Sequence, residues 1–138
     1  MPPDVFDVPW STARRQHVEA LLSDARDEAL SWEAKADRKG DRLGRHHVAK
    51  TVCGFANSRD GGYLIVGAAK QHAGFHVVGI EEPPWGEGDA GEWLDSTIAA
   101  SVRPRPWYDV RVLAGEPFLA VVAVDPVPDP PVKAVEVV

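Results

Sequence analysis

The sequence predicts an α+β domain in which a mixed β-sheet carries its helices mainly on one side. Apolar runs of strand length are broken up by helix-like segments of unequal length, which favours an α+β fold with a mixed sheet. The 138 residues suit a single domain. An apolar fraction of 44% is ordinary for a globular protein, so burial of apolar side chains can supply the core.

Two helices are expected in the first half of the chain. The first covers about residues 12–24, and Ser11 is suited to cap its N-terminus. The second covers about residues 43–57, where apolar residues recur at helical spacing. We expect the small residues Gly54 and Ala56 to let this second helix lie close to the sheet.

The remaining elements are short. A third helix is expected over residues 92–102, with Trp93 and Ile98 facing inward. Apolar runs bounded by turn residues predict strands. Their expected ranges are 29–35, 63–69, 74–80, 108–113 and 117–124.

The chain divides into a body and two ends. Residues 11–125 are expected to form the domain. The Pro-rich residues 1–10 are expected to form an extended N-terminal arm that ends at Trp10, and residues 126–138 a Pro-rich tail or a final edge strand. The abrupt end at Val138 suggests a piece of a longer protein.

Cysteine and apolar content indicate the compartment. Cys53 is the single cysteine, so no disulfide can form within the chain, and no CxxC pair suggests zinc. The adjacent His46 and His47 diverge by about 100° on a helix and do not share a metal easily. No signal peptide or apolar run of membrane-spanning length is present, so we expect a cytoplasmic protein.

Charge is distributed unevenly along an acidic chain. The net charge is -6, which argues against a nucleic-acid partner on average. Residues 35–50, however, carry six basic residues against two acids, which gives +4 and leaves -10 elsewhere. This basic strip, a candidate phosphate-binding surface, consists of Lys35, Arg38, Lys39, Arg42, Arg45 and Lys50.

A second basic patch is predicted near the third helix. Arg103 and Arg105 form it, and Trp107 and Tyr108 follow directly. An aromatic side chain beside such a patch can stack on a base. We nevertheless expect both aromatic residues to lie in the core.

The most specific motif is the run from Thr51 to Gly67, which resembles the signature of the Schlafen-type AlbA-like domain family. In that family a helix ending in Ala-Phe-Ala-Asn leads through a Gly-Gly turn into an apolar strand ending in Gly. The residues of this run also fit such a turn: Asn57 can occupy a left-handed conformation at the helix end, and glycines 61–62 can reverse the chain. It also aligns Glu33-Ala34-Lys35 with the family's Glu-Phe-Lys strand.

Relatives in this family include metal-dependent endoribonucleases whose site uses three carboxylates. The resemblance places two of them at Glu28 and Glu33, with Lys35 near a phosphate, and these are the candidate catalytic and metal-binding residues. The third acid is missing, because Ala69 and Lys70 stand where the family has it. A lysine there can neutralise the glutamate pair. We therefore expect no cofactor, and Mg²⁺ or Mn²⁺ only if the chain is a nuclease.

Three hypotheses follow. The first is a non-catalytic module that binds the backbone of RNA or DNA. The second is a metal-dependent endoribonuclease that acts on tRNA-like RNA. The third is a protein-interaction or regulatory domain, and because family members with a full core join two related lobes, a lone lobe is a candidate homodimer.

Overall fold

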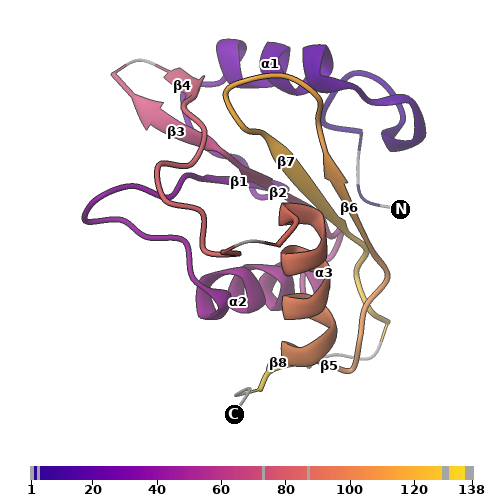
Figure 1. The fold of residues 1–138 in the computed structure, drawn as a ribbon. Helices are drawn as coiled ribbons and strands as arrows, with labels where there is room; N and C mark the ends of the chain where they lie inside the picture. The colour runs from indigo at the N-terminus through magenta and orange to yellow at the C-terminus, as the bar shows by residue number, and fades with distance from the viewer. Residues whose placement is uncertain (1, 3, 73, 87, 129–130, 136–138) are drawn as a thin grey trace.

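The computed structural model describes residues 2, 4–72, 74–86, 88–128 and 131–135. Helices cover both faces of a central sheet (Figure 1). In chain order the elements are η1 (Trp10–Thr12), α1 (Arg15–Asp24), β1 (Trp32–Lys35), α2 (Arg45–Ala56), β2 (Gly62–Val66), β3 (Ala68–Gln71), β4 (Gly74–Val77), α3 (Ala90–Ser101), β5 (Val102–Arg103), β6 (Tyr108–Val112), β7 (Ala120–Val124) and β8 (Lys133–Ala134).

The central sheet is mixed, as the sequence predicts. Its strand order is β1-β2-β7-β6, with β1 parallel to β2 and the other neighbours antiparallel. Strands β2 and β7 are buried along their whole length, which fits their continuous apolar sequences. The described residues also form two small sheets, the β3-β4 hairpin and the β5-β8 pair. The prediction of an α+β fold is confirmed.

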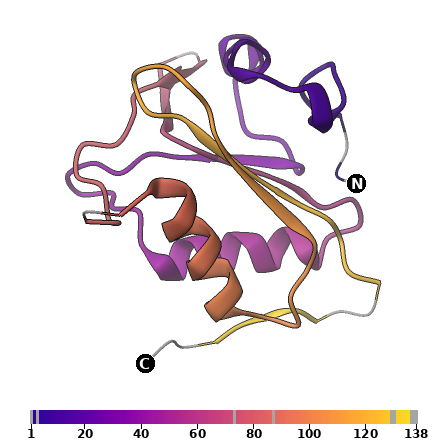
Figure 2. The same ribbon diagram turned by 45° about the vertical axis from the view of Figure 1, so that its right-hand side comes forward.

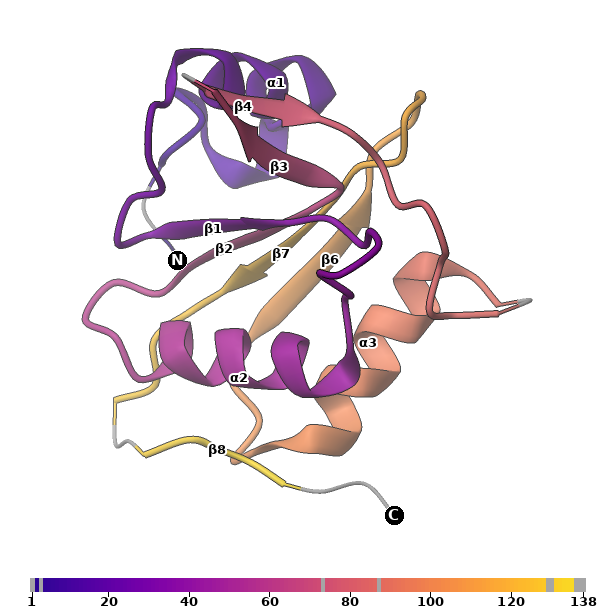
Figure 3. The ribbon, with the colours of Figure 1, turned by 90° about the vertical axis from the view of Figure 1, so that its left-hand side faces the viewer.

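Alternate residues of the central strands face opposite sides of the sheet, because successive side chains of a strand do so. Leu64 and Val122 pack in the cluster that contains α2 and α3, whereas Ile65 and Val121 pack in the cluster that contains α1. Figures 2 and 3 show α2 and α3 together below the sheet and α1 above it. Two of the three described α-helices therefore lie on one face, in agreement with the predicted arrangement.

The first residues of the chain pack on the α1 side of the sheet. Phe6 and Trp10 are buried, and the Phe6 ring meets the Tyr63 ring edge-on with centroids 4.8 Å apart. Trp10 donates its indole N–H to Asp109 on β6 at 2.8 Å. The Arg111 guanidinium stacks 3.9 Å from the Trp10 ring. These contacts join the N-terminal residues to strand β6.

Helix α1 begins later than the sequence predicts. Ser11 lies in the short helix η1, and α1 begins at Arg15 with Arg14 in the N-cap position. The Arg14 backbone N–H donates to Nδ1 of His17 at 2.9 Å. The prediction that Ser11 caps the helix is wrong, because the side chain of His17 satisfies an N–H of the first turn instead.

The predicted strand 63–69 is interrupted at Gly67. This glycine has φ 106°, a conformation that L side chains rarely adopt. A Cβ at this position would lie 2.2 Å from the carbonyl oxygen of Phe118. The chain therefore leaves the central sheet after Val66 and continues as the β3-β4 hairpin.

The turn between α2 and β2 uses its residues differently from the expectation. Asn57 has φ -88° and ψ -6°, so the predicted left-handed conformation is wrong. Its side-chain amide instead binds the backbone of Val132 in both directions, at 3.0 and 2.7 Å. Gly61 has φ 77°, whereas a Cβ on Gly62 would lie 2.3 Å from the Phe55 ring. Gly61 thus allows the turn, and Gly62 leaves room for the Phe55 ring.

The C-terminal segment returns to the α2-α3 side. Val132 is buried in that core, and β8 pairs antiparallel with β5. Residues 129–130 and 136–138 of the predicted tail lie outside the described residues. No helix in the described ranges is both long enough and apolar enough to cross a membrane.

A substitution at Gly67 tests the break after β2. We expect Gly67→Ala to lower the free energy of unfolding by about 2–4 kcal/mol, because Cβ meets backbone and φ is unfavourable. Denaturant unfolding measures the change. Gly54→Ala is the matched control, because nothing lies within 4 Å of its added Cβ. We expect that control to gain about 0.5–1 kcal/mol, and equal effects of the two substitutions would contradict this description.

Candidate functional site

A groove of about 510 Å³ lies between α2 and the segment that leads into β1. Its volume is in the range of sites that hold small molecules. Apolar surface comes from Leu30, Trp32 and Phe55, of which Leu30 is 99% exposed. The polar lining comes from Glu28, Glu33, His47, Lys50, Thr51 and Ser58.

Helix α2 presents one face to the core and another to this groove. Its apolar stripe, which includes Val48 and Val52, is buried. Residues three and four positions apart share a helical face, so His47, Lys50 and Gly54 lie together on the groove side. Gly54 is exposed, and the expectation that it lets the helix approach the sheet is wrong. Ala56, which is fully buried, is placed as expected.

Glu33 connects strand β1 with helix α2. Its Oε2 accepts a hydrogen bond from Oγ1 of Thr51 at 2.8 Å and lies 3.5 Å from Nε2 of His47. The contact with His47 is the largest cause that lowers the pKa of Glu33, and Thr51 and Lys35 act in the same direction against partial burial. Glu33 is therefore stabilised as a carboxylate at the groove.

The pKa of Glu28 is shifted in the opposite direction, above its ordinary value. Its Oε2 accepts a hydrogen bond from the backbone N–H of Ala34 at 2.6 Å. Burial is the largest cause that raises the pKa of Glu28, and the charge of Glu33 adds to it. The Ala34 hydrogen bond and the charge of Lys70 oppose the rise. One groove thus holds two carboxyl groups whose environments shift their pKa values apart.

The position expected for a third acid carries no carboxylate. Ala69 is buried, and Lys70 forms an ion pair with Asp27, the residue before Glu28. Within the described part of the chain, no three carboxylate, imidazole or thiol groups lie close enough together to hold a metal ion. Mg²⁺ and Mn²⁺ need several oxygen ligands. The residues present do not fit the three-carboxylate metal site of the nuclease relatives.

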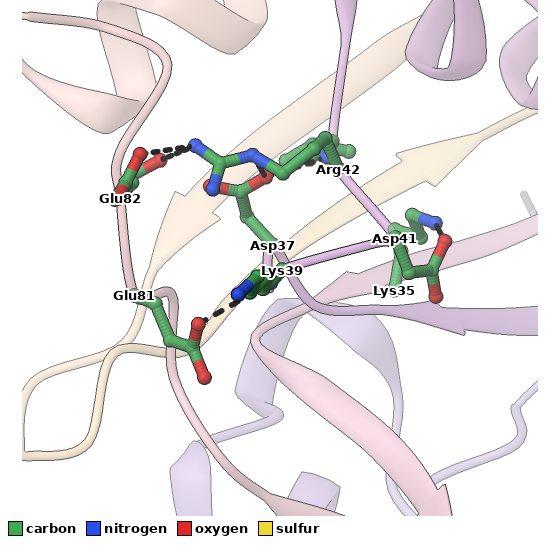
Figure 4. A network of polar contacts seen from close by, with 8 residues as sticks. Lys35, Asp37, Lys39, Asp41, Arg42, Glu81 and Glu82 are labelled. Atoms are coloured by element: carbon green, nitrogen blue, oxygen red, sulfur yellow. Dashed lines mark hydrogen bonds and ion pairs between the residues drawn. The ribbon is translucent and has the colours of Figure 1, made fainter.

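Three of the six residues of the predicted basic strip, Lys35, Arg42 and Arg45, make polar contacts within the protein. Figure 4 shows Lys35 paired with Asp41 and Arg42 between two acids. Nε of Arg42 lies 3.1 Å from Oδ1 of Asp37, and Nη2 lies 2.8 Å from Oε2 of Glu82. Asp37 is only 1% exposed, so Arg42 compensates a buried charge. These pairs hold the loop before α2 against the loop after β4.

Arg45 joins α2 to α3. Its Nη1 donates to Oγ1 of the buried Thr97 at 2.8 Å, and its guanidinium lies 5.3 Å from the centroid of the Trp93 ring. The remaining three residues of the strip are not held in this way: in the residues that the structure describes, no ion pair forms at the side chains of Arg38, Lys39 and Lys50.

The second predicted patch lies apart from the groove lining. Arg103 donates to the carbonyl oxygen of Val102 at 2.9 Å, and Arg105 is exposed. Trp107 is 47% exposed, so the expectation that it lies in the core is wrong. Tyr108 is partly buried and donates its hydroxyl to Oδ1 of Asp95 at 2.7 Å.

A comparison with protein families classifies the domain. Residues 28–137 match the family described as Schlafen, AlbA_2. The chain belongs to this family. Among curated proteins, none matches the sequence significantly.

Two solved structures resemble this Schlafen AlbA_2 domain. One is the N-terminal domain of a RecG-related protein, named for an ATP-dependent DNA helicase, from Nitrosomonas europaea; it has 22% identity and a TM-score of 0.59 over 83% of this chain and 74% of that one. The other is the DIP2311 protein of Corynebacterium diphtheriae, with 20% identity and a TM-score of 0.52 over 85% of this chain and 22% of that one. Both likenesses show the fold.

The sequence motif of the Schlafen AlbA_2 domain locates only part of the groove. Glu28 and Glu33 both line it, whereas Lys35 is paired with Asp41. His47 and Thr51, the partners of Glu33, were not among the predicted site residues. Their four-residue spacing on a helix is a usable signal, because it places both on one face.

The two glutamates should change stability with pH in opposite directions. The lowered pKa of Glu33 contributes stability above the ordinary value of 4.5, and this contribution is lost as pH falls through the folded-state pKa. We therefore expect the deficit of Glu33→Gln relative to wild type to shrink below that value. The raised pKa of Glu28 has the reverse sign, so Glu28→Gln should gain relative to wild type as pH rises. Denaturant unfolding across pH measures both, and parallel profiles would contradict the assignment.

We expect Arg42 to stabilise the folded protein and not only to add positive charge to its surface. We expect Arg42→Ala to lower the free energy of unfolding by about 1–3 kcal/mol, because the buried Asp37 carboxylate loses its counter-charge. Lys39→Ala is the control, since this exposed side chain forms no ion pair in the described residues; its effect should stay within about 0.5 kcal/mol. If thermal or denaturant unfolding gives both variants the same stability, the network in Figure 4 has no structural role.

Proposed function

We propose that this Schlafen AlbA_2 domain is a nucleic-acid-binding module that holds the phosphate backbone along α2 and has no catalytic role. The observation that carries the proposal is the position of Lys50. Its side chain is exposed and lines the groove, and no ion pair to it forms within the described residues. A cation in this state is available to a phosphate.

Two other basic residues of the strip support the same proposal. Arg38 and Lys39 precede α2 and also form no side-chain ion pair in the described part of the chain. A structural neighbour supplies a second argument, because the RecG-related protein is named for a DNA helicase. Contacts of this kind position a backbone and do not read bases, so the proposal covers RNA and DNA alike.

The number of strip cations without an ion pair also sets the expected salt dependence of nucleic-acid binding. With about three cations available to phosphates, the slope of log K against log salt should be near -2 for a single strand. Affinity should then fall by roughly twentyfold between 50 and 200 mM salt. A strip with all six cations free would give a much steeper fall.

Charge reversal at Lys50 tests the proposal. We expect Lys50→Glu to weaken binding of tRNA and duplex DNA uniformly across sequences, because a phosphate contact is replaced by repulsion. Arg14→Glu is the matched control, since Arg14 is exposed at the start of α1 on the other side of the sheet and the substitution changes net charge equally. A salt titration by fluorescence anisotropy measures both variants. If both variants bind as wild type, or neither the wild type nor the variants bind at low salt, the proposal fails.

The same samples separate the module from a nuclease. The two groove carboxylates do not form a site for Mg²⁺ or Mn²⁺ in the described residues. We therefore expect intact RNA after incubation with Mn²⁺, read on a gel beside a chelator control. Mn²⁺-dependent cleavage of tRNA-like RNA that Glu33→Ala abolishes would favour the endoribonuclease hypothesis instead.

The protein-interaction hypothesis makes a different prediction. It requires a partner that is retained after nuclease treatment, and the homodimer version requires twice the monomer mass in solution. Light scattering with and without oligonucleotide distinguishes self-association from association through nucleic acid.

A further inference from the structure

The groove combines features that a backbone-binding surface alone does not need. It contains two carboxyl groups, an exposed leucine and a lysine within one volume of about 510 Å³. Carboxylates repel phosphate, so a purely phosphate-binding groove would not place Glu28 and Glu33 beside Lys50. A ligand that carries hydrogen-bond donors at one end and negative charge at the other would match this lining.

Both glutamates have acceptor capacity left for such donors. Glu28 and Glu33 each use Oε2 in the bonds described above. Within the described residues, neither Oε1 accepts a hydrogen bond. Nε2 of His47 is buried at the same place; it lies 3.5 Å from Oε2 of Glu33 but makes no hydrogen bond of good geometry within the described residues. A buried polar atom without a well-formed hydrogen bond is unusual, and a ligand can supply one.

Gly54 adds a steric argument. A glycine inside a helix costs roughly 0.5–1 kcal/mol relative to alanine. Here no packing requirement explains it, because nothing lies within 4 Å of an added Cβ and φ is not positive. The residue lines the groove, so the space beside it belongs to the ligand's side of the helix. A ligand that lies close to the α2 backbone accounts for the glycine.

We propose that the groove holds one unpaired nucleotide of the bound strand, with its phosphate at Lys50, its sugar or base against Gly54 and Leu30, and an amino-bearing base edge at Glu28 and Glu33. Carboxylates accept from the amino group of cytosine, which uracil lacks. The orientation follows from charge, since the phosphate avoids the glutamates. This inference rests on the proposed function and adds a preference among bases to it.

Short oligonucleotides of cytidine and uridine test the inference, because the two differ in the group that faces the glutamates. We expect wild type to bind the cytidine strand about tenfold more tightly at low salt. Glu28→Ala should reduce this preference, whereas Lys50→Glu should weaken both strands equally. Gly54→Leu should abolish binding in the groove without loss of thermal stability, because leucine favours helix more than glycine does.

Gly44→Ala is the control for the glycine substitution. A Cβ at Gly44 also meets nothing within 4 Å, but this residue precedes α2 and does not line the groove. It should leave the base preference unchanged. Equal binding of the two strands, or binding that Gly54→Leu leaves intact, overturns the inference while the backbone-binding proposal stands. If neither strand binds wild type at low salt, both fall. Displacement of the strands by an arginine-rich peptide with higher affinity would assign the groove to a basic peptide.

Discussion

The hydrogen bond between Thr51 and Glu33 is the contact on which the rest of the site depends. It joins the edge strand β1 to helix α2 across 2.8 Å, and so fixes the width of the groove between them. Among the described strands, β1 is at the edge of the central sheet, beside the groove. The opposite face of α2 is anchored in the core by Val48 and Val52. Helix α2 is thus connected to the edge strand β1 at one side and to the core at the other.

The charged side chains near the groove have different roles. Arg42 and Arg45 hold loops and helices in place through Asp37, Glu82, Thr97 and Trp93. Under the proposed function, Lys50 binds an external anion, and the remaining oxygens of Glu28 and Glu33 accept from external donors. A sum over the sequence cannot separate these roles, since it counts a buried counter-ion and an available cation alike. The acidic net charge is therefore compatible with a local phosphate contact.

The sequence was sufficient for those features that local patterns determine. Continuous apolar runs predicted the buried strands, and the run from Thr51 to Gly67 predicted the family. Tertiary contacts decided the rest: the φ of Gly67 depends on the approach of Phe118, and Asn57 is held by Val132, 75 residues away. The role of Gly54 was misjudged because a sequence shows that a residue is small but does not show which face of the helix it occupies.

The most direct test of the central claim is the map of amide chemical-shift changes when a short single strand is titrated into the labelled protein. The account predicts that the changes concentrate on residues 28–33 and 47–58, the two ranges that contain the residues lining the groove. Saturable changes confined to residues 103–108, or no changes at low salt, would contradict it.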